Sequence, residues 1–84
     1  NGWHFSPAAE TLTKSFDFND FGDTFDFMSK VASLSDAQDH HPEWTHSHDT
    51  LHVTLHTNTV DAVTQEDVYL AQEMDSIYDD HVSR

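Results

Sequence analysis

Apolar and polar residues alternate in two short stretches near the start of the chain. Trp3 to Phe5 is a short aromatic run that stops before Pro7, which is typical of an edge strand closed by a turn. From Thr11 to Phe18 the apolar residues share one face and the polar residues the other, with Lys14 interrupting the apolar face. This alternation predicts a half-buried strand, and the two strands would form a hairpin.

From Asn19 onward the apolar residues follow a helical period. Asn19 or Asp20 can cap a helix that runs to about Asp39. Its apolar residues form two stripes roughly 120° apart, a first stripe of Phe21, Phe25, Met28 and Ala32 and a second stripe of Phe27, Val31 and Leu34. Because a helix resting on one sheet needs a single stripe, two stripes predict two packing partners. We expect the second stripe to meet a helix of another subunit; a wider contact within the chain is the alternative.

Two further strands and a second helix complete the pattern. Pro42 ends the first helical region, Trp44 opens an extended stretch, and residues 47–50 form a predicted turn. Residues 51–56 alternate between aliphatic and polar side chains, as a strand does. Thr64 with Asp67 resembles a capping box that opens a helix with a broad apolar face. The order β-β-α-β-β-α predicts an α+β fold, with one four-stranded antiparallel sheet and both helices on one face.

The length of 84 residues suits a single domain, residues 1–84, with a small hydrophobic core. The chain has no cysteine, so an oligomer or a histidine-bound metal remains as a source of additional stability. The histidines include the pairs His46/His48 and His52/His56. No defined ligand motif links them, and we expect no metal site.

Charge restricts the classes of partner. The chain has 16 acidic residues against 3 basic ones, a formal net charge of −13. Such a charge repels phosphate backbones and anionic membrane surfaces, so we expect no direct binding to nucleic acid or membrane. No apolar run approaches the ~20 residues of a membrane span, and no signal peptide is visible. We therefore expect a soluble cytoplasmic protein.

Residues 36–44, Asp-Ala-Gln-Asp-His-His-Pro-Glu-Trp, are the most informative stretch for chemistry. Asp36 lies four residues before His40, which is one helical turn if the helix persists that far. A carboxylate there can hold the tautomer of an imidazole and raise its basicity. Such a pair suits general acid–base catalysis. Taken alone, however, adjacent His40 and His41 at a helix end are more often a polar surface feature.

This block resembles the signature of the pterin-4a-carbinolamine dehydratase family, also known as the dimerization cofactor of a homeodomain transcription factor. The resemblance rests on Asp36 and the run from His40 to Trp44, and it extends over residues 16–32, 51–55 and 63–71. It covers nearly the whole chain. The family fold agrees with the element order above and adds an N-terminal helix that would end where this chain begins. Members of the family form dimers and tetramers.

The resemblance implies dehydration of a 4a-hydroxytetrahydropterin to a quinonoid dihydropterin, with no metal or organic cofactor. This step recycles a tetrahydrobiopterin-type cofactor for aromatic amino acid hydroxylases. His40 and His41 match two of the three active-site histidines of the family, and Asp36 matches the acidic residue before them. We expect these three residues to be catalytic, with Asp36 orienting His40. Asp67 matches the aspartate that closes the motif, and we expect it mainly to cap a helix.

Two positions depart from the family pattern. His48 stands where the third strand of the family has an aromatic residue, and Asn58 stands where the third histidine does. Asn58 cannot shuttle a proton at neutral pH, and losing one acid–base group typically costs about 10²–10⁴ in rate. His56 is the candidate replacement, two residues earlier and about 6.5–7 Å away. The residues expected to bind the pterin are His40, His41, Pro42, His56, Thr57 and Asn58.

A binding role on the same fold is the alternative. Some members of the family act as protein partners, and a weak or inactive member could serve as an assembly or coactivator module. The Asn58 departure favours this alternative. The intact set of Asp36, His40 and His41 favours the enzyme, because a purely structural module has no chemical need of it.

Overall fold

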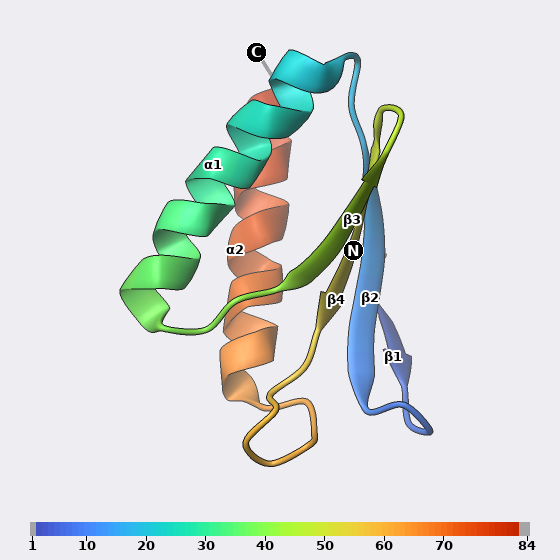
Figure 1. Cartoon of the computed structure of the whole chain (residues 1–84), viewed down its shortest axis with the longest axis vertical. Helices are drawn as coiled ribbons and strands as arrows, with labels where there is room; N and C mark the ends of the chain where they lie inside the picture. Colours follow the sequence, from blue (N-terminus) through green and yellow to red (C-terminus); the bar gives the residue numbers. More distant parts are fainter. Residues whose placement is uncertain (1, 83–84) are drawn as a thin grey trace.

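The computed structural model describes residues 2–82 and, within them, the side chains of residues 2–81. Its elements are β1 (His4–Ser6), β2 (Thr11–Asp17), α1 (Phe21–Gln38), β3 (Glu43–Ser47), β4 (Thr50–Leu55) and α2 (Gln65–Val82). The strands form one antiparallel sheet in the order β1-β2-β4-β3, and both helices lie on the same face of it (Figure 1). The predicted α+β fold and element order are confirmed.

The pairing of the two central strands decides which residues face the helices. Phe16 of β2 lies opposite Leu51 of β4, and both side chains are buried under the helix layer. Lys14, two residues before Phe16, shares this face, and its Nζ donates to Oδ1 of Asp75 on α2 at 2.7 Å. The interruption that Lys14 makes in the apolar pattern is therefore resolved by an ion pair with a helix.

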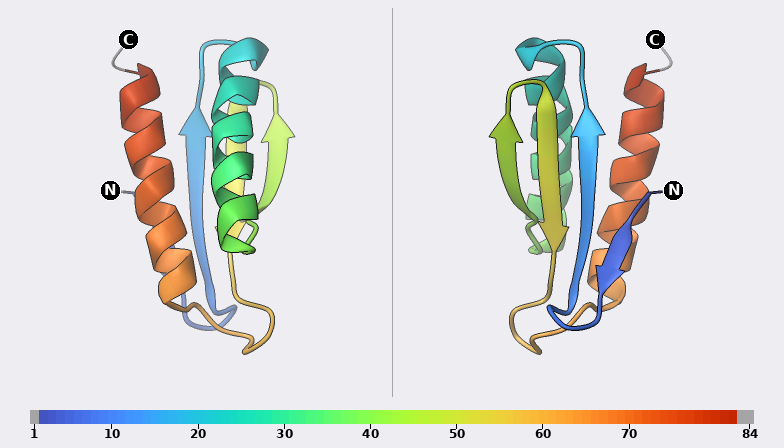
Figure 2. Two further views of the ribbon diagram at one scale, coloured as in Figure 1. Left: turned by 90° about the vertical axis from the view of Figure 1, so that its left-hand side faces the viewer. Right: turned by 90° about the vertical axis from the view of Figure 1, so that its right-hand side faces the viewer.

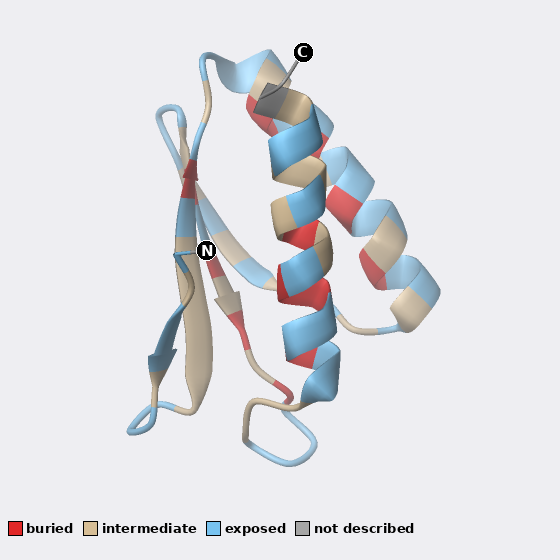
Figure 3. Ribbon diagram, turned by 180° about the vertical axis from the view of Figure 1, so that it is seen from behind, coloured by how far each residue is buried: buried red, intermediate tan, exposed pale blue. Residues whose placement is uncertain are grey.

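The hydrophobic core lies between the sheet and the two helices (Figures 2 and 3). Its buried apolar residues are Phe16, Phe27, Val31, Leu51, Val53, Leu55, Leu70, Ala71 and Met74. Trp3 and Trp44 are partly buried and pack against this core. No helix within residues 2–82 is long and apolar enough to cross a membrane.

Helix α1 packs its second apolar stripe into the core and exposes the phenylalanines of its first, although Met28 of the first stripe is partly buried against the core. The expected assignment of the two stripes is therefore wrong. Phe27 and Val31 of the second stripe are fully buried, whereas Phe21 and Phe25 of the first are 60% and 58% exposed. The side of α1 that carries Phe27 faces both the sheet and α2, and its ring lies 5.0 Å from that of Phe16. Phe21 and Phe25 are therefore the part of the first stripe that is left for a second partner.

The two ends of α1 are set by local backbone geometry. Of the two candidate caps, Asp20 is the one observed, and its side chain accepts from the backbone N–H of Asp23 at 2.9 Å. At the other end Asp39 adopts the left-handed conformation (φ 55°), and the N–H of His40 bonds to the carbonyl of Ser35 at 3.1 Å. This is a Schellman-type ending, and it turns His40 off the helix axis.

Candidate active site

Two loops and two helix ends meet at one end of the molecule, the lower end in Figure 1. They are the end of α1 with the segment 39–42, the segment 56–64 after β4, and the first turn of α2. Together they form a cavity of about 330 Å³. Its lining residues are Asp39, His40, His41, His56, Thr57, Asn58, Thr59 and Glu66. Five of the six residues expected to bind the pterin are thus brought together, and Pro42 lies outside the lining because it already leads into β3.

His40 is oriented by Asp67, and the expectation that Asp36 would orient it is wrong. Nε2 of His40 lies 2.6 Å from Oδ1 of Asp67, which is 27 residues further along the chain. The prediction assumed that the helix continues through His40. The helix ends instead with Asp39 in the left-handed conformation, so His40 no longer lies one helical turn from Asp36.

Asp67 is a fully buried carboxylate with several donors around it. Its Oδ2 accepts from the backbone N–H of Thr64 at 2.9 Å, which is one half of a capping box, and from the hydroxyl of Thr57 at 2.7 Å. Burial alone would raise the pKa of Asp67, but the bonds from Thr64, Thr57 and His40 together lower it below its ordinary value. Asp67 therefore stays ionised at neutral pH and serves as both helix cap and site residue.

The ionised Asp67 decides the tautomer of His40. A carboxylate can only accept hydrogen bonds, so the proton of the 2.6 Å contact must be carried by Nε2 of His40. In the neutral ring Nδ1 is then the unprotonated nitrogen. The imidazole is 11% exposed, which holds the ring in one orientation at the cavity wall. The geometry is that of a general base with a fixed tautomer.

His41 has a carboxylate partner of its own, but a more exposed one. Its Nε2 lies 2.9 Å from Oδ1 of Asp36, and the two side chains are 57% and 80% exposed. Exposed pairs of this kind constrain a side chain only weakly. Asp36 therefore belongs to the site through His41, while His41 keeps more freedom to move than His40.

His56 lines the same cavity, yet both of its ring nitrogens are engaged. Nδ1 lies 2.7 Å from the carbonyl oxygen of Glu10, and Nε2 lies 3.1 Å from Oδ1 of Asp61. Because both partners are acceptors, the ring can donate to both only when it is protonated. The pKa of His56 is accordingly raised, first by the bond to the Glu10 carbonyl and then by Asp61, against the opposing effect of burial. Both ring nitrogens of His56 thus face acceptors, and these surroundings favour its protonated form.

Of the remaining predicted residues, Asn58 lines the cavity, Thr57 supports the site through hydrogen bonds, and His48 lies outside it. Asn58 is exposed and lines the cavity, where its amide can both donate and accept hydrogen bonds. The hydroxyl of Thr57 donates to the Asp67 carboxylate and contacts the hydroxyl of Thr64, so this side chain supports the site from behind. His48 lies in the β3–β4 turn with φ 57°, within the turn predicted for residues 47–50 and outside the cavity lining.

Sequence reasoning missed the role of Asp67 as the partner of His40. The Thr64/Asp67 spacing did indicate the cap, which the structure confirms through the bond from the Thr64 N–H. A fully buried aspartate needs more donors than one cap supplies. The apolar residues Leu70 and Ala71 lie close to Asp67 on the same helix and indicate that Asp67 is buried. This burial was the signal that could have pointed to a further hydrogen-bond partner.

The chain matches known proteins over most of its length. The family model described as pterin 4 alpha carbinolamine dehydratase matches residues 1–77. A protein of Nitrobacter winogradskyi with a provisional pterin-4-alpha-carbinolamine dehydratase name is 40% identical over 76 residues, which cover 90% of this chain and 75% of that protein. A Bradyrhizobium protein with the same provisional name is 40% identical over 77 residues, 92% of this chain and 78% of that protein.

Solved structures agree with this assignment. The transcriptional coactivator/pterin dehydratase of Brucella melitensis superposes with a TM-score of 0.89 at 37% identity, covering 93% of this chain and 83% of that one. A pterin dehydratase-like protein identified as a RuBisCO assembly factor in the alpha-carboxysome shares the fold, with a TM-score of 0.78 at 22% identity over 93% of this chain and 90% of that one. The sequence match, the fold and the histidine site coincide, and the chain belongs to the pterin-4-alpha-carbinolamine dehydratase family.

Proposed function

We propose that the protein removes water from a 4a-hydroxytetrahydropterin to give a quinonoid dihydropterin, using its own histidines and no metal or organic cofactor. The observation that carries the proposal is the 2.6 Å contact between His40 and the buried, ionised Asp67 at the wall of a cavity that His41 also lines. A purely structural module has no need of an imidazole with a fixed tautomer. Family membership supports the same reaction class.

The dehydration needs one base and one acid. A proton leaves a ring nitrogen of the pterin, the bond from C4a to its hydroxyl oxygen breaks, and that hydroxyl takes a proton and departs as water. His40 is suited to be the base, because its neutral form has Nδ1 unprotonated while Nε2 donates to Asp67. His41, whose Nε2 meets the Asp36 carboxylate, would supply the proton to the leaving hydroxyl.

Asn58 and His56 would position the substrate. The exposed Asn58 amide can hydrogen-bond the pterin or the departing water. In its protonated form, which its two acceptor partners favour, His56 would place a positive charge near the leaving hydroxyl and stabilise the negative charge that develops there. Neither residue is proposed to carry a proton in the reaction. The product would serve aromatic amino acid hydroxylases in the cytoplasm.

The test is the rate at which freshly generated 4a-hydroxytetrahydropterin loses water in the presence of the protein. The parent chain should accelerate the reaction over buffer, and His40→Ala and His41→Ala should each lower the rate by about 10²–10⁴. His52→Ala is the matched control, because His52 is exposed and contacts Ser15 on β2, outside the cavity. No acceleration by protein shown to be folded would contradict the proposal and favour a binding role.

The exposed stripe of α1 supports a second, compatible role in association. Phe21 and Phe25 are largely exposed and their rings stack with centroids 6.2 Å apart, and the Phe21 ring also lies 5.4 Å from that of His46 on β3. Exposed aromatic surface of this kind is expected at a protein–protein contact. We infer that this face meets a second copy of the chain in a homodimer or homotetramer. A protein-assembly function without catalysis would use the same face.

A further inference from the structure

A groove adjoins the candidate active site between the last turn of α1 and the first turn of α2, at the lower end of both helices in Figure 1. It encloses about 330 Å³ and is lined by Gln38, Gln65, Glu66 and Tyr69. Glu66 also lines the cavity that holds His40 and His41. Because the two cavities share this residue, a molecule held beside the histidines can extend past Glu66 into the groove.

The surface of the groove is largely apolar, although three of its four residues are polar. The methylene groups of the glutamine and glutamate side chains and the ring of Tyr69 supply this surface. Tyr69 is 46% exposed, so much of its ring is open to a ligand. Glu66 and Tyr69 are three positions apart on α2, and their side chains therefore lie on one face of the helix. A carboxylate beside an open ring suits a ligand segment that has both carbon and hydroxyl groups.

The proposed substrate has a part that the histidines do not need to contact. The reaction takes place at C4a, and only N5 separates C4a from C6, the carbon that carries the variable substituent of a pterin. A pterin with C4a near His40 and His41 therefore starts its C6 substituent in the same cavity. On one side the lining of this cavity is the exposed loop of Asn58 and Thr59. On the side of Glu66 it continues into the groove.

The charges along this path are negative. Asp39 and Glu66 are among the lining residues, and no lysine or arginine is among the described residues that line either cavity. A carboxylate accepts hydrogen bonds and repels other carboxylates, and the net charge of −13 acts in the same sense. An uncharged substituent with hydroxyl groups can donate to Glu66, whereas an anionic substituent is repelled.

We propose that the groove holds the C6 substituent of the pterin and selects an uncharged, hydroxyl-bearing substituent over an anionic one. Glu66 would accept a hydrogen bond from a hydroxyl group of the substituent, and the ring of Tyr69 would pack against its carbon atoms. Both would determine specificity, and neither takes part in the proton transfers proposed for His40 and His41. This role rests on the proposed function, because that function makes the ligand a pterin.

The test uses oxidised pterins, which bind without undergoing the dehydration and whose fluorescence reports binding to the whole chain. Biopterin has an uncharged dihydroxypropyl substituent, 6-methylpterin a short apolar one, and pterin-6-carboxylate an anionic one. The parent chain should bind biopterin about tenfold more tightly than 6-methylpterin, as expected for a hydrogen bond to a charged group. It should bind pterin-6-carboxylate more weakly than 6-methylpterin.

Two substitutions test whether the groove is the source of these preferences. Glu66→Gln should reduce the preference for biopterin over pterin-6-carboxylate by about fivefold or more, the size of the repulsion between two charges about 4 Å apart in water. Tyr69→Ala should reduce the preference for biopterin over 6-methylpterin. Val68→Ala changes an exposed residue of α2 that lines neither cavity. Glu73→Gln removes the same charge as Glu66→Gln, about two turns further along α2. Both controls should keep the preferences of the parent.

The outcomes separate the groove from the catalysis. Preferences that survive both Glu66→Gln and Tyr69→Ala would overturn the role of the groove, because the substituent would then leave the cavity on another side. Equal effects of Glu66→Gln and Glu73→Gln would overturn it too, since they would mean general repulsion by an acidic chain. So would the absence of saturable binding of all three pterins. A chain that shows the expected preferences and variant effects but does not accelerate water loss would support the groove and contradict the dehydration alone.

Discussion

Nε2 of His40 and Oδ1 of Asp67 lie 2.6 Å apart although 27 residues separate them in the chain. The contact joins the segment after α1 to the first turn of α2. Asp67 is fully buried and the His40 ring is 11% exposed, so little water competes for this hydrogen bond. The same carboxylate caps α2 through Thr64. The residue that sets the tautomer of the proposed base is thus also a part of the fold.

Replacing Asp67 should impair the reaction more than replacing Asp36. Asp67→Asn keeps the shape but offers an amide that can donate to Nε2 of His40, which would favour the wrong tautomer. We expect the dehydration rate to fall by about 10² or more and the pH–rate profile to shift. Asp36→Asn, the same change at the exposed partner of His41, should cost less than about tenfold.

Stopped-flow measurement of both variants over a range of pH distinguishes this role from a merely structural one. A loss of folding would lower the catalysed dehydration rate by the same factor at every pH without shifting the pH–rate profile. Circular dichroism would report such a loss. Equal losses for Asp67→Asn and Asp36→Asn would show that the buried pair has no special role in the reaction.

Asn58→His should raise the dehydration rate. The position lines the cavity and is exposed, so an imidazole can be accommodated there without disturbing the core. A third titrating group within reach of the substrate should increase the rate by about 10–100-fold, toward the range of one acid–base group. Asn58→Gln is the matched control, since its amide cannot shuttle a proton at neutral pH. Equal rates for the two variants would mean that His40 and His41 already complete the acid–base set.

The local rules of helix capping and strand alternation were enough to predict the element order of the fold. Asp20, as one of two candidate caps with Asn19, and Thr64 were identified as helix starts because capping depends on residues within one turn. The assignment of the apolar stripes of α1 was wrong for a different reason. Phe25 and Phe27 are equally apolar, and which of them is buried depends on where α2 packs, which no pattern within α1 contains.

The histidines of the site could be predicted from the sequence, but their hydrogen-bond partners could not. His40 and His41 were identified from their neighbours, whereas the partner of His40 depends on the backbone of Asp39. A left-handed residue after a helix is usually glycine, and an aspartate there gives a weak signal, although it tolerates this conformation better than most residues. The contact from His40 to Asp67 then depends on how two distant segments pack, which periodicity along the chain does not report.

The stability contributed by His56 should decrease as the pH rises. Its pKa is raised above the ordinary 6.5, so the folded chain binds this proton more tightly than the unfolded chain does. The stabilisation is complete below about pH 6.5 and is lost as the pH rises through the folded-state pKa. The difference in free energy of unfolding between the parent and His56→Gln should therefore be larger in acid than in alkaline buffer, as measured by urea unfolding.

Asp61→Asn provides the control for this pH dependence. It replaces the charged acceptor of the His56 ring with a neutral amide and leaves the bond to the Glu10 carbonyl in place, so it should reduce the pH dependence in part. If the stability curves of the parent and His56→Gln run parallel across the neutral range, His56 does not hold its proton more tightly in the folded state.

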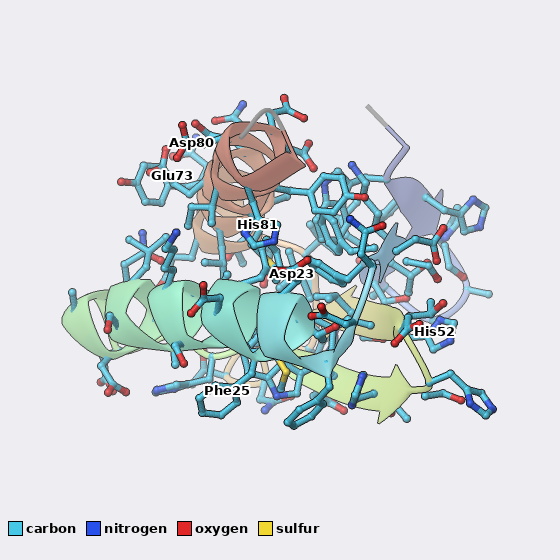
Figure 4. The ribbon with its side chains drawn as sticks, turned by 90° about the horizontal axis from the view of Figure 1, so that it is seen from above. Asp23, Phe25, His52, Glu73, Asp80 and His81 are labelled. Atoms are coloured by element: carbon cyan, nitrogen blue, oxygen red, sulfur yellow. The ribbon has the colours of Figure 1, made fainter. Side chains whose placement is uncertain are left out.

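Two phenylalanines of α1 provide a matched test of which face is core and which is interface. Phe27 is fully buried and Phe25 is 58% exposed, and Figure 4 shows Phe25 on the side of α1 away from α2. Phe27→Ala should lower the free energy of unfolding by about 3–5 kcal/mol, as buried aromatic truncations do. In an isolated chain Phe25→Ala should change it by no more than about 0.5 kcal/mol.

If the chain forms oligomers, the expected effect of Phe25→Ala changes, but that of Phe27→Ala does not. If the exposed stripe meets a second copy, Phe25→Ala should shift the sedimentation coefficient toward that of the monomer and remove the dependence of Tm on protein concentration. Phe27→Ala should unfold more easily at every concentration, because its contacts lie within one chain. A parent chain that sediments as a monomer across the concentration range would contradict the proposed oligomer, and a Phe25→Ala variant that associates like the parent would place the interface on another face.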